Sequence, residues 1–297
     1  MSWSPSVGAY RAGAAVARAT PEPVRAALTR GLASAICRAS PDRRAIVEQN
    51  LRRIYGPGLS GRALERSVRQ TFESYGRYWA ESFRLPTMSI DELDGHFSFE
   101  GFEHIVRARA AGKGPLVVVP HLGGWEWAAF WLTQVNDIGV TAVVERLEPP
   151  ELFEWFVGFR EALGMHVVPV GADAATEIVK AVKRLDVICL LADRDIAGTG
   201  VEVEFFGETT TLPSGPALLA FRTGAPLIPV GVYFEGDYHH AIVRPPIPVE
   251  RQGALREDVA RITQSIAGEL EILIRRAPEQ WHLMEPNWPA DRAATVG

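Results

Sequence analysis

The sequence predicts an α/β protein with a mostly parallel central sheet flanked by helices. From about residue 100 onward, short apolar runs alternate with segments of helical periodicity. Strands buried on both faces give such continuous apolar runs, and parallel strands need a crossover between them, usually a helix. With 47% hydrophobic and 23% charged residues, the 297-residue chain can bury a sizeable core.

The first 95 residues are predicted to be helical. Three segments with prolines between them have apolar residues at helical spacing: Val7–Val16, Val24–Ile36 and Ile46–Ile54. A further helix over about Gly61–Phe83 carries an aromatic stripe, which is typical of a core, although rings at a membrane interface or in an acyl groove have the same spacing. Because no repeat or convincing linker is visible, we expect a single domain over residues 1–297, with a helical part (1–95) and an α/β core (96–297).

The α/β core is predicted to alternate between helix and strand. Its helices are expected at Phe102–Ala111, about Gly124–Asn136, Pro149–Leu163, Ala174–Arg184, Ser214–Thr223 and roughly Leu255–Arg276. Its strands are expected at Pro115–Pro120, Val140–Val144, His166–Val170, Val187–Ala192, Leu227–Glu235 and His239–Arg244. Gly164 and Gly224 supply helix C-caps, and Gly236 with Asp237 makes a tight turn between the last two strands.

Apolar and cysteine patterns bear on the cellular compartment. No run of eighteen apolar residues is present, so no transmembrane helix is expected, and Arg11 and Arg18 interrupt any signal-peptide core. Cys37 lies in an amphipathic helical pattern and Cys189 in an apolar strand pattern. Two buried free thiols are therefore predicted, which indicates the cytosolic side of the membrane.

Basic residues are concentrated at the N-terminus, although the whole chain has a net charge of −5. Nine arginines stand against three acidic residues through residue 60. Either the composition is simply arginine-rich, or this part lies on anionic lipid, where each basic residue contributes about 1 kcal/mol. The acidic chain, without any matching motif, gives no support to a nucleic-acid partner.

The sharpest motif is the segment Pro120–Glu126, which directly follows the first predicted strand of the core. Ligands of parallel sheets bind beyond the carboxyl ends of strands, so His121 stands where a site is expected. Gly123 and Gly124 allow a tight strand-to-helix turn, and the Glu126 carboxylate can reach back to the imidazole or cap the helix. Alternatively, His121 is a hydrogen-bonded turn residue and Glu126 only complements the helix dipole.

A histidine followed after four residues by a carboxylate, as His121 and Glu126 are here, resembles the motif of the lysophospholipid acyltransferase superfamily. The Gly-Gly-Trp-Glu form is similar to the branch containing the lipid A late acyltransferases. Further segments resemble the actinobacterial phosphatidylinositol mannoside acyltransferases, in matching order over about residues 10–285: Glu145–Leu147, Phe153–Arg160, Leu163–Met165, Asp193–Asp195, Gly200–Gly207, Leu212–Ala217 and Gly224–Val230.

The resemblance implies an enzyme that moves a palmitoyl-like fatty acyl chain from acyl-CoA to a mannose hydroxyl of phosphatidylinositol mannosides. It implies a peripheral protein at the cytosolic face of the plasma membrane and no cofactor beyond the co-substrate acyl-CoA. The arginines of the N-terminal part favour an anionic membrane surface as partner. Two alternatives remain open: another glycolipid or a lysophospholipid as acceptor, or a lipid-binding relative without activity. Position 126 is Glu where many relatives carry Asp, and because the longer side chain still carries a carboxylate, activity is expected to be retained.

The expected catalytic residues are His121, Glu126 and Asp193. A neutral His121 imidazole would remove the proton of the attacking hydroxyl, and a carboxylate on its other nitrogen would fix the tautomer. Glu126 is close in sequence, whereas Asp193 follows the predicted strand Val187–Ala192. The resemblance favours Asp193 for this role, with Glu126 structural. The chain lacks a Gly-x-Ser-x-Gly elbow, which argues against a serine hydrolase.

Five residues are predicted to bind substrate. Arg146, Arg160 and Arg194 are candidate phosphate contacts, and Glu145 and Glu202 are candidate acceptors for sugar hydroxyls. Two alternatives are open: Arg194 pairs with Asp195 or Glu202, and Glu202 only lies on an exposed strand face.

Two further expectations concern the acyl chain and the C-terminus. An acyl groove is expected near the aromatic residues Trp125, Trp127, Phe130 and Trp131; the alternative is that these rings are ordinary helix packing. The tail carrying Trp281, His282, Met284 and Trp288 is expected to pack on the core. No metal site is expected, because no Cys/His cluster has zinc spacing and the sequence contains no His-Glu-x-x-His.

Overall fold

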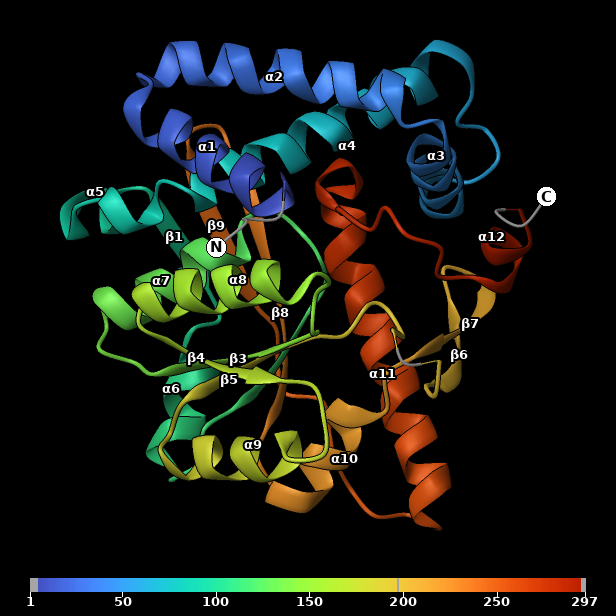
Figure 1. Cartoon of the computed structure of the whole chain (residues 1–297). Coiled ribbons are helices and arrows are strands. Elements are labelled where there is room, and N and C mark those ends of the chain that lie inside the picture. Colours follow the sequence, from blue (N-terminus) through green and yellow to red (C-terminus); the bar gives the residue numbers. More distant parts are fainter. Residues whose placement is uncertain (1–4, 197, 295–297) are drawn as a thin grey trace.

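A computed structural model of the chain describes residues 5–196 and 198–294. Its centre is a seven-stranded sheet with the order β1-β9-β8-β2-β5-β3-β4 (Figure 1). Every neighbouring pair is parallel except β8 and β9, which are antiparallel and joined by a turn at Gly236. The strands are β1 (Phe97–Glu100), β2 (Leu116–Val119), β3 (Val140–Val144), β4 (Met165–Pro169), β5 (Val187–Leu191), β8 (Leu227–Glu235) and β9 (Tyr238–Val243).

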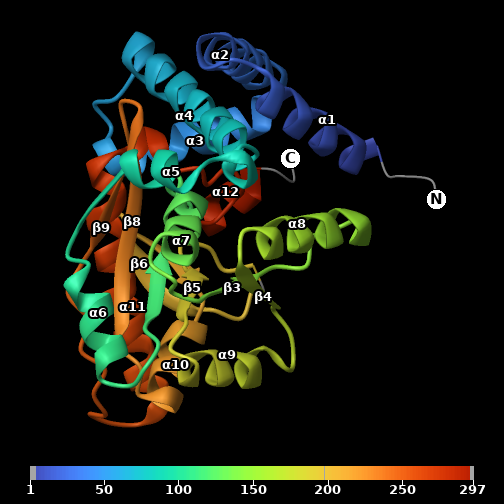
Figure 2. The same ribbon diagram turned by 90° about the vertical axis from the view of Figure 1, so that its left-hand side faces the viewer.

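Helices cover both faces of the sheet (Figures 1 and 2). One face packs against α6 (Glu103–Ala110), α7 (Trp125–Gln134) and α8 (Pro150–Ala162). The other packs against α9 (Ala174–Lys183), α10 (Gly215–Thr223) and α11 (Leu255–Arg276). Along β2, Leu116 and Val118 join the second core and Val117 and Val119 the first, which explains why the whole strand is apolar. The predicted α/β fold with a mostly parallel sheet is therefore confirmed.

The N-terminal part consists of helices, as predicted. These are α1 (Pro5–Ala19), α2 (Glu22–Ala39), α3 (Pro41–Tyr55), α4 (Gly61–Ser82) and the short α5 (Ile90–Gly95). Helix α2 runs along one end of the molecule and packs on α4, which separates it from the sheet (Figures 1 and 2). The aromatic stripe of α4 packs inward, with Phe72 and Tyr78 buried.

The sequence did not predict several short elements. Strand β1 has four residues and pairs only with β9, so it lies at the edge of the sheet and leaves little signal. A separate antiparallel hairpin is formed by β6 (Val201–Phe205) and β7 (Glu208–Leu212). The 3-10 turns η1 (Leu85–Thr87) and η2 (Pro278–Gln280) and the short helix α12 (Pro289–Ala294) complete the described chain.

Two predictions about single features can be checked directly. Cys37 and Cys189 are both buried and free, as expected. None of the described helices is both long and apolar enough to span a membrane.

Candidate active site

His121 lies in the loop that joins β2 to α7, at the carboxyl end of a central strand. This loop passes very close to β8, because a Cβ atom on Gly123 would lie 1.9 Å from the carbonyl oxygen of Val232, and Gly123 has a φ of 55°. Glycine is therefore required at this position. The side chain of His121 is 32% exposed, so its ring can be reached from outside the core.

Asp193 holds the His121 ring. Strands β2 and β5 pair in parallel with Val119 opposite Leu191, and the same register brings the residues that follow them, His121 and Asp193, side by side. The distance from His121 Nδ1 to Asp193 Oδ1 is 2.7 Å. A carboxylate can only accept, so Nδ1 carries the proton and Nε2 is left free to act as a base.

Three N–H groups bind the buried Asp193 carboxylate. Besides the imidazole, the His121 backbone N–H donates to Oδ2 at 2.9 Å and the Trp281 indole N–H donates to Oδ2 at 2.7 Å. Burial alone would raise the pKa of Asp193, but the charge and hydrogen bonds of His121 and the bond from Trp281 lower it below its ordinary value. Asp193 is therefore a fixed negative charge beneath the imidazole.

The charge of Asp193 shifts the titration of His121. Burial by itself lowers the pKa of His121, but the Asp193 charge and hydrogen bond more than offset this effect, so the pKa is raised. The nearby Arg194 guanidinium opposes this rise. The imidazole is thus a stronger base than an isolated one.

Glu126 does not contact His121. Its carboxylate accepts a hydrogen bond from the Tyr78 hydroxyl at 2.7 Å and pairs with Arg160 at 3.0 Å. Burial raises the pKa of Glu126, against the opposing effects of Arg160 and Tyr78. Of the two carboxylates considered from the sequence, Asp193 contacts the imidazole and Glu126 joins α7 to α4 and α8.

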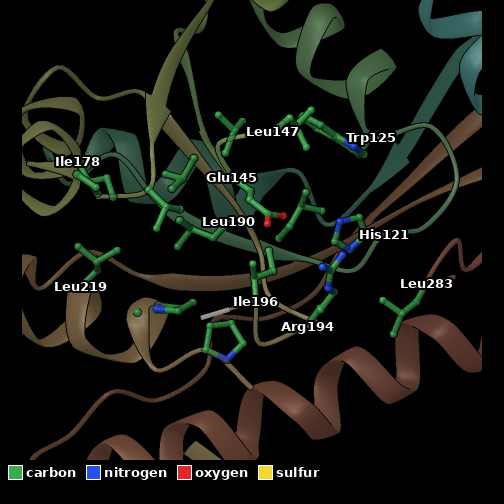
Figure 3. A pocket seen from close by; sticks show the side chains of 18 of the residues that line it. His121, Trp125, Glu145, Leu147, Ile178, Leu190, Arg194, Ile196, Leu219 and Leu283 are labelled. Atoms are coloured by element: carbon green, nitrogen blue, oxygen red, sulfur yellow. The ribbon is translucent and has the colours of Figure 1, made fainter. Parts of the chain in front are cut away.

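A cavity of about 990 Å³ opens at His121 (Figure 3). It extends from His121 past Leu190 to Ile178 of α9 and Leu219 of α10, so this end is lined largely by apolar side chains. The end near α4 carries polar groups from Arg43, Tyr75, Tyr78, Arg160, His282 and Glu285 beside the apolar Trp79 and Phe156, and Arg222 and Arg251 also line the cavity near α10. The apolar end can accommodate a hydrocarbon chain, and the polar end can accommodate a hydrophilic group.

Four predicted site residues line this cavity: His121, Glu145, Arg160 and Arg194. Trp125 of the expected acyl groove also lines it. Figure 3 shows Glu145 reaching into the cavity and Arg194 beside His121. Arg194 has no ion-pair partner among residues 5–196 and 198–294, so the pairings with Asp195 or Glu202 are not observed. Asp195 instead accepts hydrogen bonds from the backbone N–H groups of Gly198 and Gly200.

Two predicted substrate contacts lie elsewhere. Arg146 is exposed, and its guanidinium lies 5.7 Å from the centroid of the Phe153 ring. Glu202 is on the exposed face of β6, opposite Thr211. Neither residue lines the cavity.

The prediction that four aromatic residues line the acyl groove was wrong for three of them. Trp127 stacks on His239 at 4.0 Å, Trp131 packs on Phe97 at 4.7 Å, and Phe130 belongs to the same core. Helix α7 is apolar on nearly every side because it is buried between the sheet and α5, so its rings fill the core. The apolar wall of the cavity comes instead from α9, α10 and the ends of β3 and β5.

Sequence reasoning missed the contribution of the tail. Leu122 and Trp281 form an antiparallel bridge, and Trp281 bonds to Asp193 while His282 lines the cavity. Asn287 also donates to the Asp193 backbone carbonyl at 3.0 Å. The packing expected of the tail is observed, but about 160 residues separate it from the motif, and no local pattern indicated that it contacts Asp193 and the motif loop.

Comparison with known proteins gives a consistent family. Residues 5–289 match the family model described as bacterial lipid A biosynthesis acyltransferase. Two proteins named phosphatidylinositol mannoside acyltransferase, from Mycobacterium tuberculosis strains CDC 1551 / Oshkosh and ATCC 25618 / H37Rv, are each 38% identical over 289 residues, covering 95% of this chain and 88% of the relative. A protein of the same name from Mycolicibacterium smegmatis is 37% identical over 290 residues, covering 95% of this chain and 91% of the relative.

Proposed function

We propose substrates for this protein on the basis of its family. The chain belongs to the bacterial lipid A biosynthesis acyltransferase family and is an acyltransferase. We propose that it moves a fatty acyl chain from acyl-CoA to a mannose hydroxyl of phosphatidylinositol mannosides. The names of the three mycobacterial relatives support this acceptor. The observation that carries the proposal is the His121–Asp193 pair at the mouth of a largely apolar cavity.

His121 supplies the base for this reaction. A sugar hydroxyl is a weak acid, and general base catalysis typically contributes 10²–10⁴-fold to its reactivity. Nε2 of His121 takes the proton while the hydroxyl oxygen attacks the thioester carbonyl, and Asp193 stabilises the imidazolium. When the C–S bond breaks, the imidazolium returns the proton to the leaving sulfur, so CoA departs as a thiol and the ester remains.

The cavity wall suggests where the parts of the substrates lie. The acyl chain occupies the apolar end between α9 and α10, near Ile178 and Leu219. Arg194 contacts a phosphate of the lipid head or of CoA, since it lines the cavity without an ion-pair partner among the described residues. Arg160 is less suited to this task because its charge is already paired with Glu126.

Helix α2 supports a membrane-bound location. Val24, Leu28, Leu32 and Ile36 recur every four residues and are between 41% and 63% exposed, which gives an unpartnered apolar stripe. Arg30 and Arg38 are exposed on the same helix. We propose that this stripe rests on an anionic membrane at its cytosolic face, where two free thiols persist.

The proposed reaction is tested with palmitoyl-CoA and vesicles containing mannosylated phosphatidylinositol. We expect a product one palmitoyl group heavier than the acceptor, with the ester on a mannose, detected by mass spectrometry. A His121→Ala variant that binds palmitoyl-CoA normally should form this product about 10²–10⁴-fold more slowly than wild type. Unchanged transfer by this variant would rule out the mechanism, and a panel with other glycolipids and lysophospholipids would reveal a different acceptor.

Membrane binding through α2 gives a second expected result. Replacing Leu28 and Leu32 together by aspartate should weaken binding to anionic vesicles at least 10-fold, because burying one leucine contributes about 1.5–3 kcal/mol. Vesicle co-sedimentation measures the effect. The matched control is Val106→Asp, which changes a similarly exposed apolar residue on α6, away from α2 (Figure 1). Equal binding by the double variant and the control would contradict the proposed orientation.

A further inference from the structure

A second imidazole stands beside His121. The tail runs antiparallel to the motif loop: the His282 N–H donates to the His121 carbonyl at 2.7 Å, and the Gly123 N–H donates to the Gln280 carbonyl at 3.0 Å. With Leu122 opposite Trp281, residues His121 and His282 are directly opposite each other. Opposite side chains of an antiparallel pair project on the same side, with Cβ atoms roughly 4.5–5.5 Å apart. Both residues line the cavity.

The His282 ring is held on α4. Its Nε2 lies 2.8 Å from the Ser74 hydroxyl oxygen, and its centroid lies 5.4 Å from that of Tyr75 and 5.7 Å from that of Tyr78. Its Nδ1 has no hydrogen-bond partner among the described residues. The ring is therefore fixed in orientation, with one nitrogen left for a ligand.

We infer that His282 binds a hydroxyl of the acceptor sugar, next to the hydroxyl that His121 deprotonates. This inference rests on the proposed function, and it assigns the polar end of the cavity to the acceptor. Vicinal hydroxyls of a sugar can meet two adjacent imidazoles, one at each ring. Ser74, Tyr75 and Tyr78 belong to α4, which packs under α2, so His282 lies toward the helix on which the lipid-borne acceptor arrives.

The electrostatics suit this role. Burial lowers the pKa of His282 to about 3, and the neighbouring His121 adds to this effect. His282 therefore stays neutral at working pH, and a neutral imidazole can either donate to or accept from a hydroxyl. A neutral ring also leaves His121 free to take up a proton, whereas a charged one would oppose it.

The test separates acceptor binding from donor binding. His282→Phe keeps the packing against Tyr75 and Tyr78 but removes the ring nitrogens. We expect the KM for the mannosylated acceptor to rise about 10-fold, as for a lost hydrogen bond of roughly 1.5 kcal/mol, and the KM for palmitoyl-CoA to stay within twofold of wild type. His282→Gln retains a hydrogen-bonding group and should recover most of the acceptor affinity.

A binding measurement completes the design. Calorimetric titration with the deacylated mannosyl-inositol head group should show weaker binding to His282→Phe, again about 10-fold, and near-normal binding to His282→Gln. An unchanged acceptor KM and head-group affinity, or an equal rise in the KM of both substrates, would overturn the role of His282. Absence of transfer by the wild type would instead refute the proposed reaction, and the titration still reports on His282.

Discussion

Replacing Asp193 by asparagine is expected to lower kcat/KM for acyl transfer about 10³–10⁴-fold while the fold persists. Oδ2 of Asp193 accepts two hydrogen bonds, one from the His121 backbone N–H and one from the Trp281 indole N–H. In the variant, the amide oxygen of asparagine will therefore take that position. The amide NH₂ then faces His121 Nδ1, which must accept. The proton moves to Nε2, and the imidazole loses the lone pair that the mechanism uses.

The same substitution should shift the pH profile. The base works only when neutral, so wild-type kcat/KM is low at acid pH and rises as the pH passes the pKa of His121, which Asp193 raises above its ordinary value. Without that carboxylate charge the pKa falls, and the acid limb of the residual activity moves to lower pH. Rates measured between about pH 5 and 9 show the shift, since the ordinary pKa of histidine is about 6.5.

Asp186 provides a control, because it lies at the other end of β5, the strand that Asp193 follows. Asp186 is also buried, but it precedes β5 and bonds to Thr141 and Arg184, away from the cavity. Asp186→Asn should lower stability and leave the pH profile of the folded enzyme unchanged. If Asp193→Asn behaved in the same way as Asp186→Asn, Asp193 would be a structural residue only.

The sequence was sufficient to place His121 because the evidence is local. An apolar strand, two glycines and a helix start follow one another, and the carboxyl end of a parallel strand is where ligands bind. Asp193 could be proposed on the same grounds. Its contact with His121 depends on β2 and β5 being neighbours in the sheet, although β3 and β4 lie between them in the chain. Strand order is a property of the packed sheet, and the periodicity of one strand does not contain it.

The remaining errors have a common physical cause. Arg146 precedes the predicted helix Pro149–Leu163 and Arg160 lies near its end, yet Arg146 is exposed and Arg160 turns inward to Glu126. Trp127, Phe130 and Trp131 looked like an acyl groove because a helix that is buried on nearly all sides shows no polar face to orient it. Trp281 and His282 meet the motif through a single antiparallel bridge. Each of these outcomes depends on tertiary contacts over long sequence distances.

Glu126→Ala is expected to lower the free energy of unfolding by about 3 kcal/mol. The Arg160 side chain is 13% exposed and pairs with Glu126, and the Tyr78 hydroxyl donates to the same carboxylate. Removing one partner of a buried ion pair leaves an uncompensated charge, which typically costs about 3–5 kcal/mol. We expect the lower end of this range because Arg160 lines the cavity and water can reach it. Urea unfolding of wild type and variant measures the difference.

A double variant at positions 126 and 160 and the pH profile of a single variant together distinguish a structural Glu126 from a catalytic one. Glu126→Gln keeps an acceptor for Tyr78, and adding Arg160→Met removes the unpaired charge, so the double variant should be more stable than either Glu126→Ala or Glu126→Gln alone. The pH profile of kcat/KM in Glu126→Gln should keep the acid limb of the wild type, because Asp193 still holds His121. A Glu126 variant with unchanged stability and an acid limb displaced as in Asp193→Asn would show instead that Glu126 controls the base.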